Sequence, residues 1–449
     1  MAEPTEGEAV KSYGGEPSEA KLAEIARYFL YIGIVGFGGP LVHIAMMEDD
    51  LVGGDGWTDQ RTFMEGLAIC NTLPGPASTQ LGIFMGWVRG GTLGALVAGG
   101  AFMLPTFALV VTFSWLYFVY QTVPSVEAFF YGINPVVIGL IVGAAWSMGR
   151  SALAEGRNDI EFELGSEAWT IDFLLLVLLV ATIVVTVVLN PNPVLSFIVA
   201  GLMAVAIYRM AWVRENRKRV GWWSAIGAIA STVYLFRDRL ESILGPYLRT
   251  AVESSPIWGL LVALWANTWV KLFLFMIYTG SFIYGGGLVL IPFIEKYVVN
   301  EFAWMTAREF VDGVAIGQLS PGPVVMTTAF VGYKLLLDAS GGVIWIAVIG
   351  ALVATIGAFG PSFVFILGFF PYFAQVRDNE IVQTALMGVN AAVVGAILGA
   401  TVTLAQESFV DPLTVILAGA TFVLFRRGID AVYLIIGGGA VGIGAFFFL

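Results

Sequence analysis

Long apolar runs without a single charged residue constrain this chain more than any other feature of its sequence. They cover 128–148, 173–189, 381–406 and 431–449. A membrane-spanning helix needs roughly 17–25 apolar residues, because each residue rises about 1.5 Å across a hydrocarbon core about 30 Å thick. The runs are continuous, whereas the strands of a membrane barrel would alternate in polarity. We therefore expect an all-α polytopic membrane protein.

The composition agrees with this expectation. Charged residues make up 12% of the 449 residues, whereas soluble domains carry about 25%. The single cysteine, Cys70, excludes internal disulfides and a cysteine-rich metal site. The single histidine, His43, is interpreted as a tolerated polar residue beside a turn. We expect no metal, no cofactor and no enzymatic chemistry.

Four segments are predicted along the chain. Residues 1–20 form a disordered acidic tail, 21–211 a first transporter repeat, 212–256 a basic connecting region and 257–449 a second transporter repeat. Much of the net charge of −11 falls in the tail and in 155–167, which argues against a nucleic-acid partner.

An internal repeat relates the two halves. Many residues of the first half recur 247 positions later, and farther along the offset becomes 256. The matched pairs include Trp57 with Trp304, Arg61 with Arg308, Glu65 with Asp312, Pro74-Gly75-Pro76 with Pro321-Gly322-Pro323, Pro105 with Pro361, and Asn134 with Asn390. This order predicts two homologous halves.

The distribution of positive charge predicts that the halves have opposite orientations. Lysine and arginine are enriched in cytoplasmic turns. The turns 121–125 and 190–193 carry neither residue, while the equivalent turns of the second half carry Arg377, Arg426 and Arg427. Equivalent turns of opposite character are typical of an inverted repeat. Three lysines of the second half fit this pattern less well: Lys271, Lys296 and Lys334.

Each half is interrupted twice at matching places, by a glycine-rich stretch and by a Pro-Gly-Pro motif. Proline ends a helix, so these motifs predict broken or re-entrant helices. Irregular backbone at membrane depth is tolerated only around a protein-lined or water-filled cavity, and the helix ends there favour anions. The substrate-binding residues expected on this basis are Gly38, Gly39, Arg61, Asn71, Pro74, Gly75, Pro76, Ser78, Thr79, Gln80, Gly285, Gly286, Arg308, Gln318, Ser320, Pro321, Gly322, Pro323 and Thr327. A purely structural kink is the alternative reading of each motif.

Two acids are candidates for proton coupling. Glu65 lies four residues after Arg61, and Asp312 four residues after Arg308, so each acid is expected beside its arginine on one helix face. Ionisable residues within a membrane are costly and usually functional. A static ion pair near the membrane interface is the alternative reading.

With these motifs in view, the chain resembles the chromate ion transporter family in its long, two-domain form. The resemblance rests on Gly36-Phe37-Gly38-Gly39-Pro40, Leu73-Pro74-Gly75-Pro76-Ala77 and Ser320-Pro321-Gly322-Pro323, and covers roughly 24–150 and 270–400. It implies proton-driven export of chromate, with sulfate as a competing substrate. The second half has Gly287 where the first has Pro40, so the halves need not contribute equally.

The resulting prediction is a secondary active transporter that exports a small oxyanion. A sulfate carrier and a passive anion channel are the alternatives. The expected surroundings are the plasma membrane of a prokaryote and its lipid bilayer, with a homo-oligomer left open.

Overall fold

The computed structural model describes residues 14–53, 56–154, 159–164, 167–216, 264–283, 287–370, 372–373 and 379–448. Several predicted features lie outside these residues: Gly285, Gly286, Arg377, most of the tail and most of the 212–256 region. The described parts are almost entirely helical, as predicted, apart from a small antiparallel hairpin of β1 (Asp159–Leu164) and β2 (Glu167–Asp172).

The first half contains seven helices among the described residues. They are α2 (Glu19–Val35), α3 (Pro40–Leu51), α4 (Gln60–Thr72), α5 (Ala77–Tyr120), α6 (Pro124–Ala154), α7 (Phe173–Leu189) and α8 (Pro193–Tyr208), followed by the short α9 (Met210–Glu215). The backbone of α5 is not helical at Gly90 and Gly91, where φ is −139° and +62°. Helix α5 is therefore a short helix joined to a long one.

The second half repeats this order. It contains α13 (Thr268–Gly280), η2 (Gly287–Val289), α14 (Leu290–Ile294), the π-helix η3 (Glu295–Glu301), α15 (Ala307–Gln318), η4 (Val324–Met326), α16 (Thr327–Ala339), α17 (Ile344–Val364), the π-helix η5 (Phe365–Phe369), α19 (Glu380–Ser408), α20 (Pro412–Arg426) and α21 (Ala431–Phe448). Helices α16 and α17 correspond to the two parts of α5, and Gly341 and Gly342 form the turn between them, with φ of 68° and 94°.

Four helices among the described residues are long and apolar enough to cross a membrane: Ala77–Tyr120, Pro124–Ala154, Ile344–Phe369 and Glu380–Ser408. Helices α7, α8, α13, α20 and α21 are apolar but shorter. The chain is thus a polytopic helical membrane protein.

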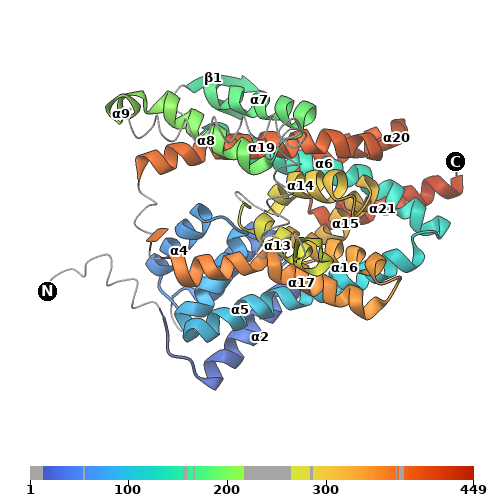
Figure 1. The fold of residues 1–449 in the computed structure, drawn as a ribbon, viewed down its shortest axis with the longest axis horizontal. Coiled ribbons are helices and arrows are strands. Elements are labelled where there is room, and N and C mark those ends of the chain that lie inside the picture. The colour runs from blue at the N-terminus through green and yellow to red at the C-terminus, as the bar shows by residue number, and fades with distance from the viewer. Residues whose placement is uncertain are drawn as a thin grey trace, which may run out of the picture.

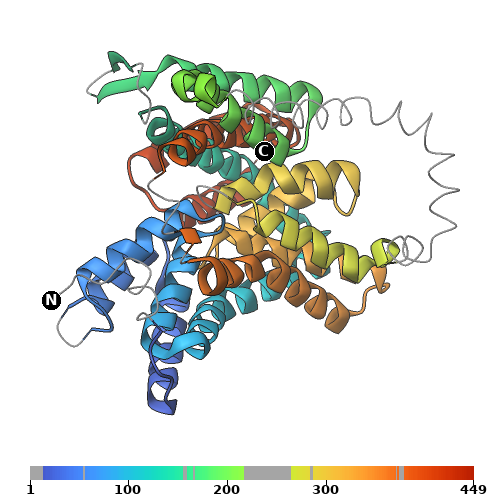
Figure 2. The ribbon, with the colours of Figure 1, turned by 60° about the vertical axis from the view of Figure 1, so that its left-hand side comes forward.

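The helices form two layers, and both halves contribute to each layer. Helices α2 to α5 pack with α13 to α17, and α6 to α8 pack with α19 to α21. In Figure 1, α7 and α8 lie beside α19 rather than beside their own α6. Figure 2 shows these green helices over the red and teal ones, with the blue helices of the first half on the other side. The halves have thus exchanged their last two helices.

Glycines of the long helices make this exchange close and symmetric. A Cβ on Gly139 of α6 would lie 2.5 Å from the carbonyl oxygen of Ala418 and 2.8 Å from Cβ of Thr421. A Cβ on Gly395 of α19 would meet Leu179 and Thr182 at the same two distances. Small residues let helix backbones approach closely in membranes.

The equivalent helices α6 and α19 run antiparallel. Tyr131, near the start of α6, lines the same pocket as Ser408 at the end of α19. Gly149, near the end of α6, faces Val394 in the middle of α19. A two-fold axis along the membrane normal would keep equivalent spans parallel, so the halves form an inverted repeat.

The three lysines that fit the charge pattern less well are each held by neighbouring groups. Lys334 pairs with Glu309 at 3.0 Å and with Asp338 at 2.9 Å, and Lys296 pairs with Glu301 at 3.0 Å. The ammonium of Lys271 lies 3.9 Å from the centre of the Phe302 ring. These contacts stabilise the three lysines, which the enrichment of positive residues in cytoplasmic turns would place on the other side of the membrane.

The glycine packing makes a prediction about stability. Replacing Gly139 by leucine forces α6 and α20 apart, so we expect the free energy of unfolding to fall by about 1–3 kcal/mol. Thermal unfolding of the purified protein in detergent measures this. Gly419→Leu, whose Cβ meets nothing within 4 Å, is the matched control. Equal melting temperatures for the two variants would show that the α6–α20 contact is not tight.

Candidate functional site

The Pro-Gly-Pro motif of the first half joins α4 to α5 and contacts the second half. Gly75 has a φ of +133°, which favours glycine, and its amide donates a 2.6 Å hydrogen bond to the carbonyl oxygen of Ile283. Ile283 lies at the glycine-rich break that follows α13. Within the motif, Nε2 of Gln80 donates to the carbonyl oxygen of Pro74 at 2.6 Å. The break in one half is therefore sealed by backbone from the other.

The Pro-Gly-Pro motif of the second half makes the reciprocal contact through a side chain. Nε2 of His43 lies 2.6 Å from the carbonyl oxygen of Gly36 and 2.9 Å from that of Pro321. A carbonyl oxygen only accepts, so Nε2 donates to both. Gly36 is the repeat equivalent of Ile283. Each of these two contacts, which we call the junctions, therefore links the glycine-rich break of one half to the Pro-Gly-Pro motif of the other half.

Two further hydroxyl residues lie against the motifs. Ser362 is close to Gly75, because a Cβ on Gly75 would lie 2.8 Å from Oγ of Ser362. Thr106 takes the corresponding place beside Gly322, whose added Cβ would collide with Oγ1 of Thr106. Thr106 and Ser362 lie on α5 and α17, the long helices that back the two motifs.

The side chains around these motifs include buried polar atoms that have no hydrogen-bond partner. They are Nδ1 of His43, Oγ of Ser78, Oγ1 of Thr79, Oε1 of Gln80, Oγ1 of Thr106 and Oγ of Ser362. All six side chains are fully buried. Buried polar groups in proteins are nearly always hydrogen-bonded, so such a concentration needs an explanation, and a bound polar ligand or water supplies one. We call this set the central polar cluster.

The remaining predicted residues of the motifs divide between the interior and the surface. Ser320 and Thr327 are buried, and their hydroxyl groups donate to the carbonyl oxygens of Gly317 and Val324. Gly38 has a φ of +107° and is exposed, as is Asn71. Gly38 and Asn71 therefore do not join the central polar cluster in this conformation.

The two predicted arginine–acid pairs differ from each other. Nε of Arg61 lies 2.8 Å from Oε1 of Glu65, as predicted, and the Arg61 side chain is 90% exposed. The pairing predicted for Arg308 with Asp312 is wrong, because Arg308 instead reaches Glu127 of α6 at 3.3 Å. Helix α4 packs mainly on α5, whereas α15 is packed among α5, α6, α16 and α19. This packing draws Asp312 into the interior and leaves Glu65 outside.

Asp312 is a buried carboxyl group, 2% exposed, between the two layers. The hydroxyl of Tyr117 donates to its Oδ2 at 2.6 Å, and the side chain of Asn134 also contacts the carboxyl group. Its Oδ1 has no partner that meets full hydrogen-bond geometry. Among the described residues, no arginine forms an ion pair with this carboxyl group, since Arg308 is engaged by Glu127.

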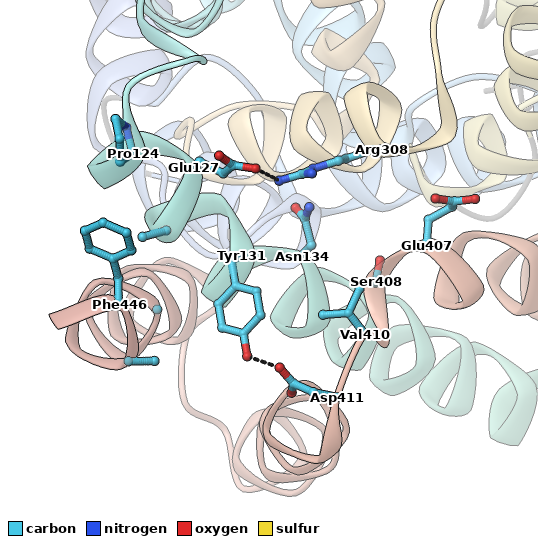
Figure 3. A pocket seen from close by; sticks show the side chains of 13 residues that line it. Pro124, Glu127, Tyr131, Asn134, Arg308, Glu407, Ser408, Val410, Asp411 and Phe446 are labelled. Atoms are coloured by element: carbon cyan, nitrogen blue, oxygen red, sulfur yellow. Dashed lines mark hydrogen bonds and ion pairs between the residues drawn. The ribbon is translucent and has the colours of Figure 1, made fainter. Parts of the chain in front are cut away.

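A surface pocket of about 480 Å³ approaches Asp312 from one end of the layers, and we call it the vestibule. Figure 3 shows the ion pair of Arg308 with Glu127 on one wall and the hydrogen bond from Tyr131 to Asp411 on another, with Asn134 between them. Its lining residues are Pro124, Glu127, Ala128, Tyr131, Asn134, Arg308, Glu407, Ser408, Val410, Asp411, Gly442, Ala445 and Phe446.

The sequence interpretation did not include His43, Thr106, Ser362, Tyr117 or Asn134 among the site residues. A signal existed for three of them, since Thr106 and Ser362 directly follow the matched prolines Pro105 and Pro361, and Asn134 matches Asn390 in the repeat. No local pattern indicates the role of His43, because its equivalent in the second half is Leu290.

Inverted halves whose helix breaks meet around buried, unpartnered polar groups define a polytopic membrane transport protein. The chain belongs to the chromate transporter family, whose family model matches residues 23–205 and 270–443. This family consists of ion transporters, not enzymes. The two matched regions coincide with the two structural halves.

Relatives cover most of the chain. It is 30% identical to the chromate transport protein of Cupriavidus metallidurans, over 90% of this chain and 88% of the relative. It is 29% identical to the probable chromate transport protein of Synechococcus elongatus, over 87% and 86%. It is 28% identical to the chromate transport protein of Pseudomonas aeruginosa, over 95% and 93%. No solved structure matches the chain at a significant level.

The link made by His43 is testable. His43→Leu introduces the residue of the second half and leaves the carbonyl oxygens of Gly36 and Pro321 unpaired, so we expect the free energy of unfolding to fall by about 1–3 kcal/mol. Thermal unfolding in detergent measures the loss, and Leu290→Met serves as the control at the equivalent position. An unchanged melting temperature for His43→Leu would contradict the link.

Proposed function

We propose that this chain is a secondary active transporter that exports chromate across the plasma membrane of a prokaryote, driven by the proton gradient. The central polar cluster is the observation that carries the proposal. Similarity to relatives named as chromate transport proteins supports the substrate class. The substrate site comprises the two Pro-Gly-Pro motifs, with Thr106, Ser362 and His43 added to the predicted set.

The chemistry of the cluster suits a tetrahedral oxyanion. Hydroxyl groups of Ser78, Thr79, Thr106 and Ser362 can rotate to donate hydrogen bonds to an oxyanion from several sides. Helix α5 begins at Ala77, directly after the motif, and the free amide groups of a helix start favour an anion. A dianion there is bound by neutral donors, which allows it to leave again.

Sulfate is the alternative substrate, because it is also a tetrahedral dianion and would use the same donors. A passive anion channel is the alternative mechanism. The buried breaks argue for a carrier, since the described residues seal both junctions by direct contacts between the halves. A channel would transport without saturation and independently of the proton gradient.

The substrate and the coupling are tested together with inverted membrane vesicles. We expect saturable uptake of labelled chromate that rises when the vesicle interior is acidified and collapses with a protonophore. Excess sulfate should compete if the donors do not discriminate between the two anions. Uptake that ignores the protonophore and does not saturate would favour the channel, and uptake of sulfate alone would exclude chromate.

Asp312 is the better candidate for proton coupling. It is buried without a direct arginine partner, whereas Glu65 is held by Arg61 at the surface. Asp312 therefore acts through its own protonation, not through exchange of an arginine partner. An intramembrane acid of this kind is typical of proton relays.

A matched pair of variants tests this assignment. Asp312→Asn should lower proton-driven chromate flux by about 100-fold, because the amide cannot take up a proton. Glu65→Gln should stay within about twofold of the wild type, since it loses only an exposed ion pair. Flux is assayed across a pH series at equal protein level. Wild-type flux and pH dependence in Asp312→Asn would place the coupling group elsewhere.

A further inference from the structure

The inner end of the vestibule is formed by Asn134, whose side chain contacts the carboxyl group of Asp312. Asn134 is 5% exposed. Oδ1 of Asn134 and Oδ1 of Asp312 both lack a partner with full hydrogen-bond geometry. Two buried oxygen atoms at the inner end of a surface pocket call for a hydrogen donor that reaches them through that pocket.

The charges of the vestibule select which species enters. Three acids, Glu127, Glu407 and Asp411, line it together with the single base Arg308. Arg308 is already paired with Glu127, so the wall carries an excess of negative charge. A cleft of one sign concentrates counter-ions and repels ions of its own sign. The vestibule therefore disfavours a dianion and favours a proton.

The vestibule opens at the end of the molecule that the charge pattern places outside the cell. It lies where α6 begins and α19 ends, and the turns 121–125 and 409–411 at this end contain no lysine or arginine. The opposite end of α6 carries Arg150, and Arg209 pairs with Glu380 where α19 begins. Positive charge marks the cytoplasmic side.

The first half shows no equivalent arrangement among the described residues. Glu65, the repeat equivalent of Asp312, lies on the surface beside Arg61. The remaining charged groups near Asp312 are on its own helix: Arg308 is engaged by Glu127, and Glu309 is paired with Lys334 of α16 at 3.0 Å. From α5 and α6 the groups that face it are Tyr117 and Asn134. Among the described residues, the acid-lined vestibule therefore leads inward to a single buried acid, Asp312.

We propose that the vestibule is the proton uptake route of the transporter, that it opens to the outside of the cell, and that the oxyanion does not pass through it. The proposal rests on the proton-coupled function proposed above. A hydronium ion in the vestibule gives its proton to Oδ1 of Asp312 and leaves as water, and the Asn134 amide positions that exchange. The proton and the oxyanion then reach the protein by separate paths, which fits export of an anion against inward proton movement.

Cysteine labelling tests the route and its side together. In a Cys70→Ala background, Val410→Cys places a thiol on the vestibule wall, and Ala303→Cys places one outside the lining at the exposed turn before α15. Both are treated from either side with a positively charged, membrane-impermeant thiol reagent in oriented proteoliposomes. A pH-sensitive dye then records the proton movement that accompanies chromate flux.

We expect labelling of Val410→Cys from the outside to lower chromate-coupled proton movement by at least about tenfold, because the added cation blocks and repels the incoming proton. Labelled Ala303→Cys should keep the unlabelled rate. Unchanged proton movement after labelling at Val410, or reaction of that thiol only from the cytoplasmic side, would overturn the proposal. Chromate flux without proton movement in the unlabelled protein would instead contradict the proton coupling itself.

A second pair of variants separates blockage from misfolding. Asn134→Leu should reduce coupled proton movement by at least about tenfold, whereas Asn134→Asp, which can still carry a proton, should retain most of it. Chromate should still raise the melting temperature of Asn134→Leu, because its binding site lies elsewhere. Full proton movement in Asn134→Leu would exclude the route past this residue.

Discussion

The need to satisfy interrupted backbone within the membrane governs this structure. A helix break exposes amide and carbonyl groups that lipid cannot pair, at a cost of several kcal/mol for each group. Each glycine-rich break is therefore closed by the Pro-Gly-Pro motif of the other half, through the amide of Gly75 on one side and the imidazole of His43 on the other. These contacts between the halves add to those within the first half, such as the hydrogen bond from Gln80 to Pro74.

The exchange of helices in the second layer also makes each half depend on the other. Helices α7 and α8 lie against α19, and α20 and α21 lie against α6, so each half supports the long helix of its partner. Close glycine contacts hold these pairs. The layer that bears the breaks thus rests on a second, interlocked layer, and the vestibule and Asp312 lie where the two layers meet.

Asymmetry between otherwise equivalent positions gives the two halves different tasks. His43 matches Leu290, and the half-buried Glu65 matches the buried Asp312. Both halves contribute to the central polar cluster, but the buried acid and the pocket that approaches it belong to the second half and to α6.

The sequence by itself determined the membrane class, the repeat, the inverted orientation and the position of the breaks at the two Pro-Gly-Pro motifs, because these depend on local composition, spacing and turn charge. It also indicated Ser78, Thr79 and Gln80, which follow the first Pro-Gly-Pro directly. Only the tertiary structure decided that Arg308 pairs with Glu127, that Asp312 is buried while Glu65 is half-buried, and that His43 spans the two halves. Spacing along one helix defines neighbours within a turn or two. The partner of His43 lies 278 residues away, and it is set by the way whole helices pack.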